Sequence, residues 1–74
     1  MTPPHQEFVI AVAMLRGAEL VDPNASGWWV AKGDGYTTPT YWHKWKAADC
    51  WLKHWGIWVE RDGSIQDFNT RIEP

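Results

Sequence analysis

Tryptophan is concentrated in one stretch of this chain, which runs from Thr38 to Val59 and reads TPTYWHKWKAADCWLKHWGIWV. The stretch holds five of the seven tryptophans and the only cysteine. A chain of 74 residues buries only about 60% of the surface that its unfolded form exposes, so it has room for one small core. A lone cysteine excludes an internal disulfide, whereas each buried indole removes about 150–250 Å² from water. We therefore predict a single domain over residues 1–74, with about four or five tryptophans in the core and about two or three exposed as binding anchors.

Charge is distributed unevenly, although the net charge is only −2. Between Thr40 and Gly56 three lysines stand against Asp49 alone, which makes this segment +2 and leaves −4 on the rest of the chain. We expect a basic, aromatic helix face beside a mildly acidic remainder.

The most apolar run, from Phe8 to Leu15, is too short to span a membrane. It is eight residues long, far short of the roughly 20 needed to cross a bilayer. The residues before it lack the positive charge of a signal peptide, and no small-residue cleavage site follows. A lone cysteine also fits a reducing compartment. We expect a cytoplasmic protein with no membrane association.

The same run predicts the first helix. Thr2 is a suitable cap with Pro3 at the first helical position, and Gly17 is a natural stop. Phe8, Val12 and Leu15 form the expected core stripe. The other positions are also apolar, so the helix either packs on two sides or presents one side to another copy of the chain.

A hairpin is predicted next, from strands at 19–22 and 28–32 joined by a loop of turn-forming residues. Trp28 and Trp29 are adjacent, so in a strand their side chains point to opposite faces. One ring can enter the core while the other lies on the far face. Residues 36–38 are expected to be extended, because they precede Pro39.

The tryptophan-rich stretch predicts the main helix, capped by Thr38 or Thr40 and ended by Gly56. A helical wheel gathers five residues into a core stripe. They are Tyr41, Trp45, Ala48, Leu52 and Trp55.

Asp62-Gly63 predicts a two-residue turn between strands at 57–61 and 64–68. With that turn Phe68 shares a face with Ile57 and Val59, while Trp58 points the other way. Residues 69–74 are expected to be frayed or a short strand end. The predicted order is α-β-β-α-β-β, an α+β fold with antiparallel hairpins packed against two helices around one small sheet.

Few residues have the spacing that chemistry requires. Cys50 and His54 share a helix face and could form half a zinc site, but His43 lies about 16 Å away along the axis. Turn formation explains Asp62 without a catalytic role, and a solvated strand face does the same for Asp67. We expect no enzyme activity, no metal and no cofactor.

Surface binding remains as the expected role. The run YWHKWK interleaves rings with cations, as in single-stranded nucleic-acid binders, and would use Trp42, Lys46 and Lys53. The same face suits a protein partner or a second copy of the chain through anchor rings with a charged rim. The candidate partner-binding residues are Trp29, Trp42, Lys46, Trp51, Lys53 and Trp58.

Three short motifs carry a resemblance to a known family. Pro39-Thr40-Tyr41, Ala47-Ala48 and Trp51, set between two hairpins, are similar to the P-Y-S-T-D and A-A-W signature of small phage proteins of the ABA-sandwich type. Trp42-His43-Lys44 stands in place of S-T-D. The resemblance implies a phage or prophage accessory protein. By analogy with other small phage proteins, we expect it to bind and modulate a host protein complex, as anti-CRISPR proteins do.

Overall fold

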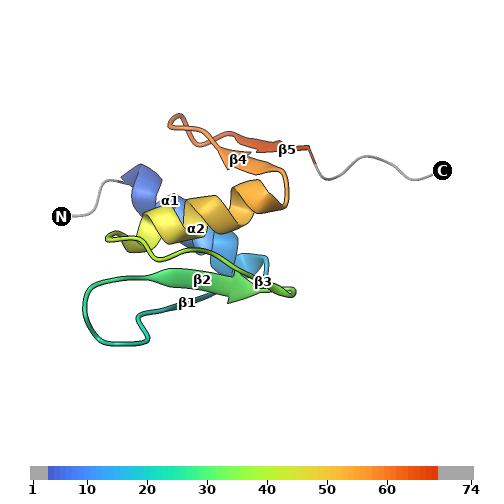
Figure 1. Cartoon of the computed structure of the whole chain (residues 1–74). Helices are drawn as coiled ribbons and strands as arrows, with labels where there is room; N and C mark the ends of the chain where they lie inside the picture. The colour runs from blue at the N-terminus through green and yellow to red at the C-terminus, as the bar shows by residue number, and fades with distance from the viewer. Residues whose placement is uncertain (1–3, 69–74) are drawn as a thin grey trace.

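The computed structural model describes residues 4–68 (Figure 1). In this part of the chain the elements are α1 (Pro4–Leu15), β1 (Glu19–Val21), β2 (Val30–Gly33), β3 (Tyr36–Thr37), α2 (Lys44–His54), β4 (Ile57–Val59) and β5 (Ile65–Asp67). The predicted α+β class, with two helices and antiparallel hairpins, is confirmed. The predicted Thr2 cap and the expectation for residues 69–74 lie outside the described residues.

Helix α2 is the central element of the fold. It packs against α1, β1, β2 and β4. The three-stranded sheet β1-β2-β3 lies on one side of the helix pair and the β4-β5 hairpin lies on the other (Figure 1). The prediction of a single sheet is therefore wrong. Chain direction explains this, because Gly56, with φ of 81°, turns β4 away from the first sheet directly after α2.

Helix α1 ends as its sequence predicts, but it buries a different face. The backbone N–H of Ala18 donates to the carbonyl of Ala13, and that of Gly17 donates to Met14, which together form a Schellman motif. Val9, Val12 and Ala13 are buried. The predicted stripe is wrong for Phe8, which is exposed, and for Leu15, which is 87% exposed. The outward face of α1 is apolar, and no other segment of residues 4–68 covers it.

The sequence predicts residues 36–38 only as extended chain, whereas the structure has a strand there, β3. It pairs with β2 through a tight turn at Asp34 and Gly35, whose φ angles are 53° and 85°. Two positive φ values are the signature of a type I′ hairpin turn, for which Asp-Gly is a preferred sequence. The predicted pairing of β1 with β2 is confirmed, with Leu20 opposite Ala31.

Helix α2 begins at Lys44, later than the predicted caps at Thr38 or Thr40. Tyr41 forms an isolated antiparallel bridge with Trp29, and this pairing holds the preceding chain extended. Tyr41 is therefore outside the helix, and the buried stripe of α2 also differs from the predicted one. The residues that α2 buries are Ala47, Ala48, Trp51 and Leu52.

The final hairpin has a register that differs by one residue from the prediction. Glu60 N–H donates to the carbonyl of Ser64, so the loop contains three residues and Gly63 has φ of 93°. A three-residue loop with a left-handed third residue is a common alternative to the two-residue turn. A shift of one residue moves the side chains of one strand to the other face. Ile57 and Val59 therefore face the core without Phe68, and Trp58 lies on the outer face with Phe68.

Asp62 explains why the longer loop is stable. Its carboxylate accepts hydrogen bonds from the backbone N–H of Ser64 at 2.9 Å and from the Ser64 hydroxyl at 2.8 Å. These bonds stabilise the charged form, and the backbone one contributes most to lowering the pKa of Asp62. The Asp-Gly sequence thus predicts a hairpin correctly, while the side-chain bonds of Asp62 select its length.

Candidate functional site

Two exposed tryptophans lie against each other at one end of the molecule. The backbone N–H of Trp29 donates to the carbonyl of Tyr41 at 2.6 Å, and Tyr41 N–H donates back at 2.8 Å. This bridge places the preceding residue, Trp28, opposite the following one, Trp42. Their rings stack with centroids 4.2 Å apart and planes at 16°. Trp28 is 40% exposed and Trp42 is 59% exposed, so the pair presents a large aromatic surface to solvent.

The loop before Trp28 holds this pair in place. The Asp22 carboxylate accepts hydrogen bonds from the backbone N–H groups of Ser26 at 3.0 Å and Gly27 at 2.7 Å. Gly27 has φ of 88° and lies against Trp42, where a Cβ would come within 3.0 Å of Cζ3. Only glycine fits where the backbone comes this close to the ring, so the position of the Trp42 ring is well defined.

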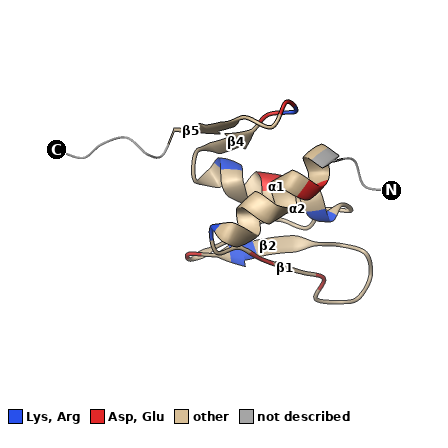
Figure 2. Cartoon of the chain, turned by 180° about the vertical axis from the view of Figure 1, so that it is seen from behind, with Lys and Arg blue, Asp and Glu red and all other residues tan. Residues whose placement is uncertain are grey.

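The lysines of α2 each lie over an indole. Lys44 Nζ lies 5.2 Å from the ring centroid of Trp29, and Lys53 Nζ lies 5.8 Å from that of Trp58. Lys46 makes the same contact with the half-buried ring of Trp45, at 5.9 Å. These distances are within the range of cation–π attraction. The lysines gather at the two ends of α2 (Figure 2), so each end combines a positive charge with an aromatic ring.

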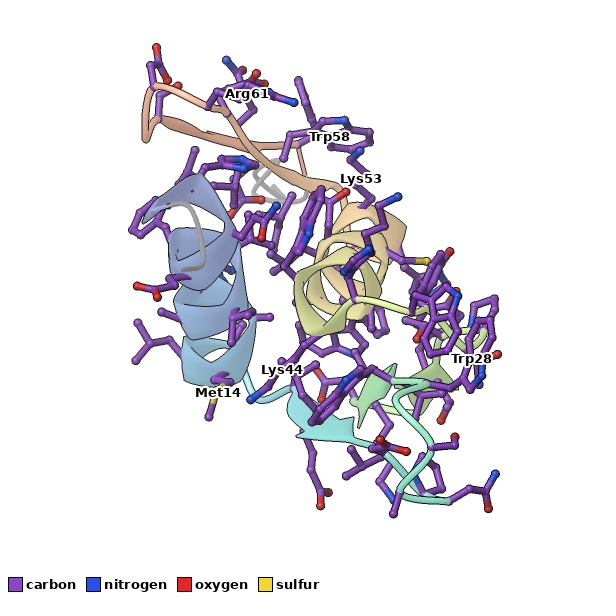
Figure 3. All side chains as sticks on the ribbon, turned by 90° about the vertical axis from the view of Figure 1, so that its left-hand side faces the viewer. Met14, Trp28, Lys44, Lys53, Trp58 and Arg61 are labelled. Carbon is purple, nitrogen blue, oxygen red and sulfur yellow. The ribbon has the colours of Figure 1, made fainter. Side chains whose placement is uncertain are left out.

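A hollow of about 300 Å³ lies along the outer side of α2. It is lined by Tyr41, Trp45, Lys46, Asp49, Cys50 and Lys53. Through Tyr41 it adjoins the chain segment of the stacked pair, and through Lys53 it adjoins Trp58. Figure 3 shows Lys53 beside Trp58 at the hairpin, with Trp28 at the far edge near the three-stranded sheet. We name these residues, with Trp28, Trp42 and Trp58, the aromatic–basic face.

The polar groups of the hollow contact one another. A hydrogen bond with Cys50 is the main cause that raises the pKa of Tyr41 to about 12, and burial adds to it. Tyr41 therefore stays a neutral phenol at physiological pH. Lys53 Nζ forms an ion pair with the Asp49 carboxylate at 3.0 Å. The hollow therefore sets two lysines against one carboxylate and carries a net positive charge.

The structure separates the predicted partner-binding residues into exposed and covered ones. Trp42, Lys46, Lys53 and Trp58 are exposed, and all four belong to the aromatic–basic face. Trp29 is half-buried beneath Lys44.

For Trp51 the expected exposure is wrong, because its ring is 1% exposed at the centre of the core. The helix packs this side against β2, where the indole N–H of Trp51 donates to the Gly33 carbonyl.

Sequence reasoning missed Trp28 as a site residue. The available signal was the adjacent pair Trp28-Trp29, of which one ring must leave the core side of the strand. Which ring leaves is decided by the bridge to Tyr41. Trp29 faces Lys44 on α2, while Trp28 faces Trp42 and solvent.

Cys50 and His54, which share a helix face, are engaged in other contacts. His54 stacks on Tyr36 with ring centroids 3.6 Å apart and planes at 4°. Within residues 4–68, no group of three His, Cys, Asp or Glu side chains is placed to hold a metal ion. Neither helix of this part of the chain is long and apolar enough to cross a membrane.

Comparison of the chain with protein-family models, with curated proteins and with solved structures finds no match. The candidate site is therefore described by its geometry alone.

Proposed function

We propose that this chain is a non-enzymatic binding protein whose contact surface is the aromatic–basic face. The observation that carries this proposal is the stacked pair of Trp28 and Trp42, which stays exposed although the chain has a small core to fill. Tryptophan dominates binding energy at many protein interfaces. An exposed pair held by backbone bonds is a surface prepared for a partner.

The energetics favour association. Taken together, the exposed parts of the two rings amount to about one whole tryptophan side chain, roughly 150–250 Å². Covering that area would contribute about 4–6 kcal/mol at about 25 cal/mol per Å², before the costs of association. Those costs are reduced because Gly27 and the bridge at Trp29 already order the rings.

A protein partner suits this face better than a charged polymer. Lys53 is paired with Asp49, and Lys46 lies over the ring of Trp45. Such cations form a rim around aromatic anchors, which is the usual anatomy of a protein interface. The partner we propose is a host protein complex in the cytoplasm of a bacterial cell. The support for a phage-encoded, anti-CRISPR-like modulator is the resemblance of Pro39-Thr40-Tyr41, Ala47-Ala48 and Trp51 to small phage proteins.

Single-stranded nucleic acid is the second candidate ligand. It is favoured by the exposed ring of Trp42, which can stack on a base, and by Lys46 on the same side of the molecule. The carboxylate of Asp49 between the lysines opposes phosphate binding. This candidate requires an affinity that falls steeply with salt concentration.

A homo-oligomer is the third candidate. The outward face of α1 exposes Phe8, Met14 and Leu15 to solvent. Figure 3 shows Met14 at the end of α1, on the far side of the molecule from Trp28. Sedimentation at micromolar concentration tests this role: a monomer mass counts against it.

A pull-down from bacterial lysate distinguishes the candidates when it is run with and without nuclease. We expect the tagged wild-type protein to retain one protein or complex after nuclease treatment, and the Trp42→Ala variant to lose it. The matched control is Leu15→Ala, which removes a more exposed apolar side chain from the opposite surface. Thermal unfolding of both variants verifies that they are folded. Retained material that vanishes with nuclease would contradict the protein-binding proposal and favour nucleic acid.

A further inference from the structure

The indole N–H of Trp55 is a buried donor without an acceptor. Trp55 is the C-cap residue of α2, and its Nε1 forms no hydrogen bond with any group in residues 4–68. Buried polar groups in proteins nearly always have a partner, so each exception calls for an explanation. The ring cannot readily turn outward. It packs edge-to-face against Trp51, Tyr36 and His54, at centroid distances of 6.0, 6.5 and 4.6 Å.

The indole of Trp55 borders a small hollow of about 120 Å³. The lining residues are Arg16, Asp34, Trp51, Trp55 and Ile57. The N–H of Trp51 is already used, because it donates to the Gly33 carbonyl at 3.2 Å. Arg16 donates one bond to Asp67 at 3.0 Å and keeps further guanidinium N–H groups. The donors that remain at the hollow therefore come from Trp55 and Arg16.

Asp34 brings a negative charge and hydrogen-bond acceptors to the same hollow. It belongs to the tight β2-β3 turn, where its backbone has a φ of 53°. Its carboxylate can only accept hydrogen bonds when ionised. The hollow therefore combines an orphaned neutral donor, a cation and an anion.

We propose that this hollow binds a carboxamide group, as carried by an Asn or Gln side chain or by the peptide backbone of a partner protein. The carbonyl oxygen would accept from Trp55 Nε1 and from the Arg16 guanidinium, and the amide N–H would donate to Asp34. A carboxylate is disfavoured by the charge of Asp34. An ammonium is disfavoured by the charge of Arg16 and offers no acceptor to the indole.

This site is separate from the aromatic–basic face. The two hollows have no lining residue in common, and the stacked pair includes Trp42 before the N-terminus of α2, whereas Trp55 follows its C-terminus. The proposal does not depend on the function of the stacked pair. If one of the two proposals fails its experiment, the other still stands or falls by its own.

The indole N–H signals in a nitrogen–proton correlation spectrum provide the test. The chain has seven tryptophans, and Trp55→Phe identifies the signal of Trp55 by its loss. Acetamide is the probe, with sodium acetate and methylammonium chloride at equal ionic strength as controls. We expect acetamide to shift the Trp55 signal saturably, at concentrations on the order of millimolar for so small a probe. Acetate and methylammonium should leave that signal in place.

The variant Asp34→Asn sharpens the test. Asparagine tolerates positive φ, so the turn is retained. Without the negative charge, acetate should now shift the Trp55 signal saturably, and acetamide should bind about tenfold more weakly because its charged acceptor is gone. The absence of any saturable shift in the wild type would overturn the proposal and leave a hollow that holds water only. Equal shifts of the exposed Trp42 signal, or equal response to acetate and acetamide, would overturn it as well.

Discussion

The indole Nε1 of Trp51 donates a hydrogen bond of 3.2 Å to the backbone carbonyl of Gly33 and thereby ties the middle of α2 to the end of β2. At the same point the carbonyl oxygen of Gly17, just after α1, lies against Gly33, where a Cβ would come within 2.6 Å of it. Three segments distant in sequence thus meet around one indole and one glycine. This close approach brings the chain after α1 and the indole of α2 to the same point at the end of β2.

Replacement of Trp51 should destabilise the fold more than replacement of any exposed tryptophan. We expect Trp51→Ala to lower the free energy of unfolding by about 3–5 kcal/mol. Trp51→Phe keeps most of the ring but leaves the Gly33 carbonyl unpaired, which should cost about 1–3 kcal/mol. Urea unfolding measures both. Trp58→Ala, at a ring that is 38% exposed, is the control and should cost less than either. A similar loss for Trp58→Ala would contradict the central role of Trp51.

Gly33→Ala should be destabilising because the new Cβ meets backbone, which cannot move aside as a flexible side chain can. We expect a loss of about 1–3 kcal/mol, as for other overpacked sites. The control is Gly35→Asn in the adjacent turn. Nothing lies within 4 Å of a Cβ there, and asparagine tolerates the φ of 85°. Thermal unfolding compares the two variants, and equal melting temperatures would show that the approach of Gly17 is not tight.

The stacked pair should show energetic coupling. We expect a double-mutant cycle of Trp28→Ala and Trp42→Ala to give a coupling of about 0.5–1.5 kcal/mol, as for other aromatic pairs. Each single variant should also abolish the exciton signal that two stacked indoles produce in circular dichroism. Trp58→Ala should preserve that signal. Additive single effects would mean that the rings do not stack in solution.

The titration of Tyr41 should reveal its contact with Cys50. In the folded chain its pKa is raised to about 12 from the ordinary value of 10.0. A raised pKa means that folding favours the neutral phenol, so this contribution to stability is complete below pH 10 and is lost as pH rises toward 12. In Tyr36→Phe, Tyr41 is the only tyrosine, and phenolate absorbance then reports it alone. Adding Cys50→Ala should lower the midpoint, since the bond to Cys50 is the main cause. An unchanged midpoint would contradict that assignment.

Local sequence determined much of the architecture. Gly17 ends α1 because a helix terminus needs a residue that accepts positive φ, and Asp-Gly pairs at 34–35 and 62–63 form the turns of two hairpins. The alternation of helices with antiparallel pairs also followed from these signals. Each of them acts within a few residues, so no distant part of the chain can override it easily.

Tertiary structure decided which faces are buried, and with them the candidate site. The bridge from Trp29 to Tyr41 keeps Tyr41 out of α2 and leaves Trp42 beside Trp28, while Trp51 packs at the centre of the core. In the last hairpin the deciding bonds are local, because those from Ser64 to Asp62 favour a three-residue loop that places Phe68 with Trp58 outside. An aromatic ring can fill a core or anchor a partner surface, so the presence of tryptophan in the sequence does not tell the two roles apart. For Trp28, Trp42 and Trp51, contacts between distant segments decide which ring is buried and which is exposed.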